Sequence, residues 1–148
     1  MDDLLLMCRI ADRQAAIPAH LVRSVIELEE ITPIPGTPPH IAGLTALRSQ
    51  ALTVIDTRVA LDFDPMEDMI GRRAAVVEHE GHPYALVLDE AYDVGTPLTE
   101  PCEVPGGFGA GWCRAATGMV ETGEGPTLTL ALDRLIDPSI DTLGQAAA

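Results

Sequence analysis

The stretch that most constrains the fold reads ITPIPGTPPHIAGLTALR over residues 31–48 and SQALTVIDTR over residues 49–58. Residues 33–39 form a stiff loop, because four prolines surround Gly36 and proline lacks the N–H that a strand interior donates. Residues 51–56 form an apolar run rich in β-branched side chains, which predicts a short strand. A stiff loop leading into a short strand favours β structure over helix.

The rest of the chain repeats this pattern of short apolar runs and turns. Turn signals recur about every ten residues and no helical period is sustained, so the sequence predicts an all-β fold with few short helical turns. Residues 100–114 are rich in Gly and Pro and predict an irregular loop. The remaining predicted strands are 4–10, 15–17, 22–28, 74–77, 84–88 and 127–132, with turns at 11–14 and 80–81 and single helical turns at 18–21 and 133–136.

A weak internal repeat accompanies these elements. A shift of 69 residues places Ala16 and Ile17 on Ala85 and Leu86, Val22 on Ala91, and Val25 on Val94. Two similar units of about five short strands are therefore expected, and closed barrels suit them because closure removes exposed strand edges. The predicted split lies near residues 62–72, with subdomains over residues 12–66 and 72–137 and residues 1–11 pairing with either one.

Composition limits the classes of partner. The 148 residues suit one domain, and the formal net charge is −14, with every cation an arginine. Such a charge repels phosphate backbones and anionic lipids, which makes nucleic acid and membrane surfaces poor candidate partners. The chain has no apolar run of about 18 residues and opens with Met1, Asp2 and Asp3 where a signal peptide carries base, so a cytoplasmic protein is expected.

No catalytic or cofactor site emerges from the residues. His79 and His82 flank a predicted turn rather than lie on one helix face, so a solvated turn is favoured over a metal site. Cys102 and Cys113 have no neighbouring base, and the glycines of residues 106–111 lack the Lys-Ser/Thr ending of a phosphate loop. An enzyme would need these histidines or cysteines to converge on one pocket; we expect no catalysis, metal or cofactor.

Residues 31–58 resemble the signature of CheW-like domains, the coupling domains of bacterial chemosensory signalling. That family shows a proline-containing loop, then Ile-x-Gly-Val-x-Asn-Leu-Arg-Gly, then an apolar strand ending in Asp-Leu. The resemblance continues collinearly through residues 76–94 and 117–136 and spans roughly residues 3–137. It implies two SH3-like five-stranded β-barrel subdomains and a non-enzymatic adaptor.

The resemblance also implies partners and contact residues. The partners are the regulatory domain of the histidine kinase CheA and the cytoplasmic tip of methyl-accepting chemoreceptors, whose helices would dock between the barrels. Arg48 matches the motif arginine tied to signal coupling, although it could instead bind a backbone carbonyl of its own loop. Gly43 matches the motif glycine, where a tight backbone is the other explanation. Val22 and Val94 fall on partner-facing strands, with burial in the core as their alternative.

Several positions depart from the family pattern. Ala46 stands where the motif has Asn, Ser49 where it has Gly, Ser24 where it has an acidic residue and Thr53 where Pro is common. The alternative function is therefore a CheW-like interaction module for another kinase or a twitching-motility-type pathway, without standard receptor coupling.

Overall fold

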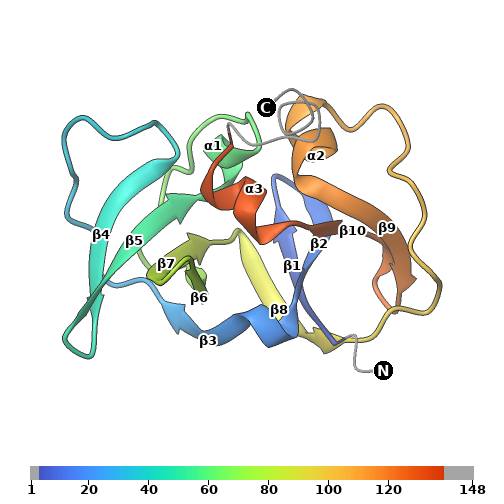
Figure 1. Ribbon diagram of the computed structural model, residues 1–148, viewed down its shortest axis with the longest axis horizontal. Coiled ribbons are helices and arrows are strands. Elements are labelled where there is room, and N and C mark those ends of the chain that lie inside the picture. Colours follow the sequence, from blue (N-terminus) through green and yellow to red (C-terminus); the bar gives the residue numbers. More distant parts are fainter. Residues whose placement is uncertain (1–3, 139–148) are drawn as a thin grey trace.

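The computed structural model describes residues 4–138, which form two five-stranded sheets lying side by side (Figure 1). The first sheet has the strand order β3-β6-β7-β5-β4, and the second sheet has the order β8-β1-β2-β10-β9. The all-β prediction is confirmed. The strands are β1 (Leu5–Ile10), β2 (Arg13–Pro18), β3 (Val22–Glu27), β4 (Ile41–Leu47), β5 (Gln50–Asp56), β6 (Arg73–His79), β7 (His82–Val87), β8 (Glu90–Gly95), β9 (Ala116–Thr122) and β10 (Gly125–Leu130).

The two sheets exchange hairpins. The β1–β2 hairpin lies in the second sheet, where β2 pairs in parallel with β10, and the β6–β7 hairpin lies in the first sheet, where β7 pairs in parallel with β5. The sheets therefore do not follow the predicted boundaries of residues 12–66 and 72–137. A contiguous split assumes that each half keeps its own strands, whereas these parallel ladders join segments far apart in the sequence. β1 pairs with β2 and β8, which places the described part of residues 1–11 in the second sheet.

The exchange makes the sheets topological copies of one another. The 69-residue shift carries β2 onto β7, and the pairing of Val25 with Ala75 recurs as the pairing of Val94 with Leu6. Adding 75 to the bounds of β4, 41–47, gives 116–122, which are the bounds of β9. The repeat found in the sequence is thus a real structural correspondence.

The exchanged hairpins are buried on both faces. On β6, Ala75 and Val77 face a central core between the sheets, whereas Ala74 and Val76 face a core inside the first sheet. Strands buried on both faces need apolar residues at every position, which explains the unbroken apolar run in this part of the sequence. The core inside the second sheet contains only Leu5, Met7, Ala16 and Val120 among the described residues.

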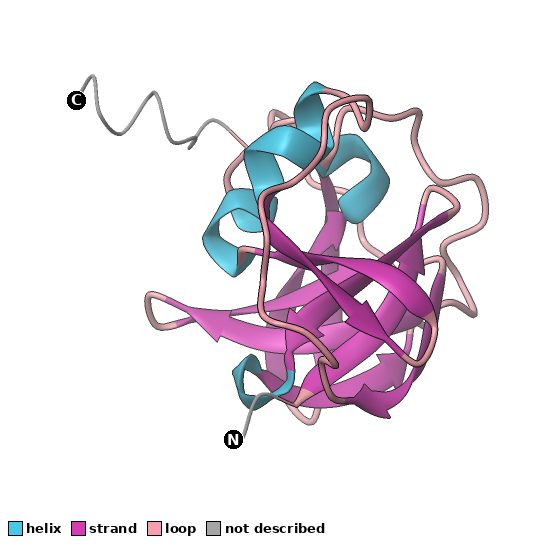
Figure 2. Cartoon of the chain, turned by 90° about the vertical axis from the view of Figure 1, so that its right-hand side faces the viewer, coloured by secondary structure: helices cyan, strands magenta, loops and turns pink. Residues whose placement is uncertain are grey.

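Three short α-helices gather at one end of the strands (Figure 2), and they are α1 (Thr57–Ala60), α2 (Ala110–Ala115) and α3 (Leu132–Ile136). A 3-10 turn, η1 (Ala19–Leu21), precedes β3. Helix α2 corrects the prediction that residues 100–114 are entirely irregular. Its Trp112 is fully buried in the central core, and a Cβ on Gly111 would lie 1.9 Å from the Leu61 carbonyl oxygen. The glycine is thus needed for close approach, and tertiary burial outweighs the local loop signal.

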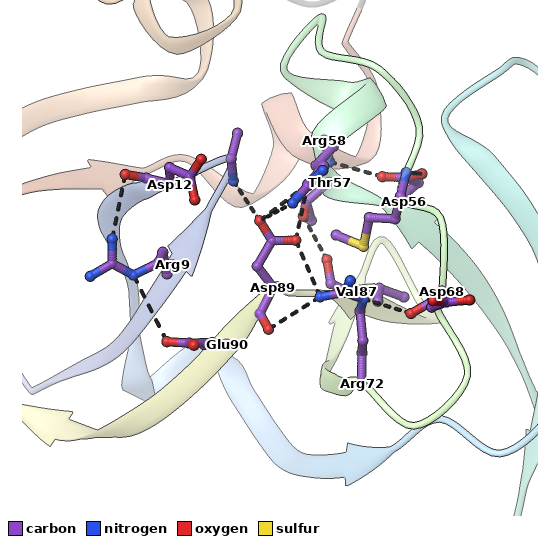
Figure 3. Close-up of polar contacts among 12 residues, drawn as sticks. Arg9, Asp12, Asp56, Thr57, Arg58, Asp68, Arg72, Val87, Asp89 and Glu90 are labelled. Atoms are coloured by element: carbon purple, nitrogen blue, oxygen red, sulfur yellow. Dashed lines mark hydrogen bonds and ion pairs between the residues drawn. The ribbon is translucent and has the colours of Figure 1, made fainter.

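One partly buried carboxylate joins the two sheets (Figure 3). Asp89 lies between β7 of the first sheet and β8 of the second, and its side chain is 9% exposed. It accepts hydrogen bonds from the Arg58 guanidinium at 2.9–3.1 Å and from the Ala11 backbone N–H at 2.7 Å. Hydrogen bonding to Asp89 raises the pKa of Arg58, so this pair stabilises the charged guanidinium. Because Arg58 follows β5 and Ala11 follows β1, the carboxylate holds the two sheets in one arrangement.

Candidate interaction surfaces

Four of the seven exposed large hydrophobic residues among residues 4–138 lie on or beside the second sheet: Leu4, Tyr92, Val94 and Leu98. Val94 on β8 is 48% exposed, and Leu98 in the loop that follows is 67% exposed. Val94 lines a pocket of about 160 Å³ whose wall includes Met7, and Leu98 lines a pocket of about 500 Å³ whose wall includes Leu5. We call these two pockets and their exposed walls the second-sheet seam.

The seam has the character of a protein contact. Met7 and Leu5 belong to the small core of the second sheet, so that core opens to the surface in both pockets. Glu100 borders the larger pocket and Glu124 the smaller one, which gives the apolar centre a polar rim. Apolar centres with polar rims are typical of protein interfaces. The exposed side chain of Val94 fits partner contact rather than core burial.

Val22 differs from Val94. It begins β3, is half-buried and packs against the central core. The valine that corresponds to Val94 in the repeat is Val25, which is 37% exposed. Sequence reasoning therefore missed Val25 as a candidate contact residue, although the 69-residue shift already placed it on Val94.

Arg48 lies at the tip of the β4–β5 hairpin. Leu47 pairs with Gln50, and the two residues between them, Arg48 and Ser49, have φ values of 52° and 71°. Two successive positive φ values are typical of the type I′ turns that connect strands tightly. The Arg48 side chain is exposed and, within residues 4–138, has neither a hydrogen-bond acceptor nor an ionic partner. A bond from Arg48 to a carbonyl of its own loop is therefore not formed, and the guanidinium is free to meet a partner.

Gly43 has a structural reason to be glycine. Its φ is 147°, it is buried, and a Cβ there would lie 2.3 Å from the Thr32 carbonyl oxygen. The segment before β4 crosses at this point, where Thr32 and the neighbouring Leu44 exchange two backbone hydrogen bonds. Gly43 thus shapes the edge of the first sheet, and any part in partner binding is indirect.

The residues considered for chemistry remain scattered. His79 and His82 pair across the β6–β7 hairpin, whereas Cys102 pairs with β9 and Cys113 lies on α2. Burial raises the pKa of the Cys8 thiol to about 12, with the nearby Asp89 charge adding to the effect. Between residues 4 and 138 there is no cluster of three or more metal-ligating side chains, and no helix has the length and apolarity to cross a membrane.

Comparison with known proteins identifies a matching family and a curated relative. A family model described as the CheW-like domain matches residues 4–138. The chemotaxis protein CheW of Bacillus subtilis (strain 168) is 30% identical over 84 residues, which are 57% of this chain and 54% of that protein. The chain thus matches about half the length of this curated relative.

A solved structure shares the fold. The scaffolding protein TtCheW from Thermoanaerobacter tengcongensis superposes with a TM-score of 0.79 at 22% identity, covering 93% of this chain and 94% of that one. The family assignment is consistent with a chain that is not an enzyme. Because the family model matches nearly all of the described residues, this chain belongs to the CheW-like domain family.

Proposed function

We propose that this protein is a non-enzymatic cytoplasmic adaptor that couples chemoreceptors to the histidine kinase CheA. Membership of the CheW-like family supports a place in chemotaxis signalling, and the proteins similar to this chain include a chemotaxis protein and a scaffolding protein. The observation that carries the proposal is the second-sheet seam, where Val94 and Leu98 expose apolar surface beside open pockets.

The adaptor would use separate surfaces for separate partners. The seam is apolar and suits a stable contact with the regulatory domain of CheA, because burying exposed apolar surface drives association. Arg48 lies on a hairpin tip of the other sheet and carries a free charge, which suits a directional contact that transmits receptor state. Receptor control and kinase binding are then separable by mutation.

Arg48→Ala tests this division. We expect the variant to fold and to bind the CheA regulatory domain within about twofold of the wild type, because surface changes away from the binding contact cost little. Receptor control of kinase activity, measured in a reconstituted mixture of receptor, kinase and adaptor, is expected to fail. Arg73→Ala, at the exposed start of β6, is the control, because it also removes an arginine whose side chain has no hydrogen bond or ion pair within residues 4–138. If Arg48→Ala retains full receptor control, the assignment of Arg48 is wrong.

The departures near Arg48 favour one alternative, a module that binds a kinase without a standard receptor. Ala46 and Ser49 flank the arginine where the family motif has Asn and Gly. Binding to a purified receptor tip separates the two functions: the adaptor binds both the tip and the CheA regulatory domain, whereas the alternative module binds the kinase alone. A chain that binds neither would contradict both.

A further inference from the structure

The edge strands of the two sheets, β4 and β9, occupy equivalent positions in the repeat but differ in the hydrogen bonding of their outward backbone groups. β4 is the edge strand of the first sheet, β9 is the edge strand of the second, and they lie at opposite ends of the molecule (Figure 1). The 75-residue shift places Leu44 on Met119 and Ala46 on Glu121. The backbone groups of β4 and β9 can therefore be compared residue by residue.

In the first matched pair, Leu44 and Met119, both residues have hydrogen-bond partners for their outward backbone groups. Leu44 exchanges two backbone hydrogen bonds with Thr32 at 2.8 and 2.9 Å. Met119 exchanges two backbone hydrogen bonds with Cys102, both at 2.9 Å. In each sheet, the segment before the edge strand supplies these partners.

In the second matched pair, Ala46 and Glu121, only Glu121 has hydrogen-bond partners for its outward backbone groups. The Glu121 carbonyl accepts a hydrogen bond from the Leu98 N–H at 2.7 Å, and the Glu121 N–H donates to the Thr99 hydroxyl at 3.1 Å. Ala46 lies two residues beyond Leu44, so its N–H and carbonyl point to the same outer side as those of Leu44. Within the described chain, these two groups of Ala46 have no partner, and the residue is exposed.

Acidic side chains lie near Ala46, the residue whose outward backbone groups have no partner in the described chain. A hollow of about 340 Å³ lies beside Ala46 and is lined on its other side by Ile26, Glu27, Glu29 and Glu30. The three glutamates are exposed, and none has a cationic partner among residues 4–138. The hollow thus combines an apolar floor, a free strand edge and three unpaired negative charges.

We infer that Ala46 and this hollow form a docking edge for an extended, positively charged segment of a partner protein. One residue of that segment exchanges two hydrogen bonds with Ala46, as Thr32 does with Leu44. Lysine or arginine side chains at alternate positions of the segment then meet the glutamates, while an apolar side chain between them contacts Ile26. This inference does not depend on the adaptor function proposed above.

Other occupants fit less well. A second copy of the chain carries the same net charge of −14, and like charges oppose association. Residues 1–3 and 139–148 include Asp2, Asp3 and Asp141 but no lysine or arginine, so their side chains supply no cation for the hollow. Charge complementarity therefore selects a basic partner.

Amide NMR with two synthetic peptides tests the inference. The probe is acetyl-Lys-Val-Lys-Val-Lys-amide, and its neutral control is acetyl-Gln-Val-Gln-Val-Gln-amide. We expect the lysine peptide to shift the amides of Ala46, Leu47 and Glu27 and to slow hydrogen exchange of the Ala46 N–H at least tenfold. The Glu121 N–H, which already has an acceptor, is expected to stay unchanged in the same spectra.

Charge variants complete the test. Glu27→Gln/Glu29→Gln/Glu30→Gln is expected to weaken the lysine peptide at least tenfold at low salt. The control Glu100→Gln/Glu103→Gln/Glu124→Gln removes the same charge from exposed sites of the second half and is expected to change binding less than twofold. Shifts that avoid Ala46, equal binding of the glutamine peptide, or an unaffected triple variant would each overturn the inference. So would protection of Ala46 that rises with protein concentration alone, which would indicate a second copy.

Discussion

The two sheets share one strand order but bury their side chains differently. Among residues 4–138, the core inside the first sheet contains eight buried residues, including Leu28 and Leu52, whereas the core inside the second contains four. Pockets of about 500 and 160 Å³ lie beside the smaller core, where Val94 and Leu98 are exposed. The comparison shows that the repeat determines the topology, while the side chains that fill each sheet determine what its surface can bind.

The difference also assigns distinct chemistry to the two ends of the molecule. The second-sheet seam is apolar and suits a contact stabilised by burial of apolar surface. The hollow of the first sheet is bordered by glutamates and lies close to Arg48, so charge governs binding there. The two proposed contacts, one apolar and one with a basic partner, therefore lie on different sheets of the domain.

The largest expected effect comes from matched leucine truncations in the two cores. Leu52→Ala removes a fully buried side chain from the larger core and is expected to cost about 3–4 kcal/mol of unfolding free energy. Leu5→Ala is expected to cost about 2 kcal/mol, because Leu5 lines an open pocket and leaves less new cavity. Urea unfolding measures both. Equal losses would mean that the second core is as tightly packed as the first.

A charged substitution separates the two predicted valines. Val22→Asp places a carboxylate against the central core and is expected to cost about 2–3 kcal/mol of stability. Val94→Asp is expected to change stability by less than about 0.5 kcal/mol, because that side chain is exposed. Thermal melting distinguishes them, and comparable destabilisation by the two changes would refute the placement of Val94 at the surface.

Much of the fold was predictable because its signals are local. Seven of the ten strands and the turns predicted at residues 11–14 and 80–81 could be read from short runs of neighbouring residues, and the repeat from a comparison along the chain. Strands β4, β8 and β9 were not predicted. The hairpin exchange could not be predicted in this way, because it depends on parallel pairing between β2 and β10 and between β5 and β7. Helix α2 was missed because burial of Trp112, rather than local propensity, stabilises it.

The candidate site was predictable only in outline. Gly43 and Arg48 could be found from their motif, but the motif does not tell whether a side chain is exposed. Val22 and Val94 look alike in sequence, and only their packing separates them. Asp89 carries no sequence signal, because its partners Ala11 and Arg58 are 78 and 31 residues away.

A smaller effect is expected at the junction that joins the sheets. Asp89→Asn removes the charge that binds Arg58 and is expected to cost about 1–2 kcal/mol, since hydrogen bonds between charged groups contribute more than neutral ones. Asp64→Asn, an exposed position, is the matched control and is expected to have no measurable effect. If urea unfolding finds both variants as stable as the wild type, the junction does not hold the sheets together.

The most direct test of the adaptor account is the affinity of Val94→Asp for the CheA regulatory domain, measured by calorimetry. The account predicts about thirtyfold weaker binding, equivalent to about 2 kcal/mol, because association would bury an unpaired charge in the seam. Ile70→Asp, another exposed apolar residue but one outside the seam, should bind within about twofold of the wild type. Wild-type affinity of a folded Val94→Asp variant would contradict the claim that this seam binds the kinase.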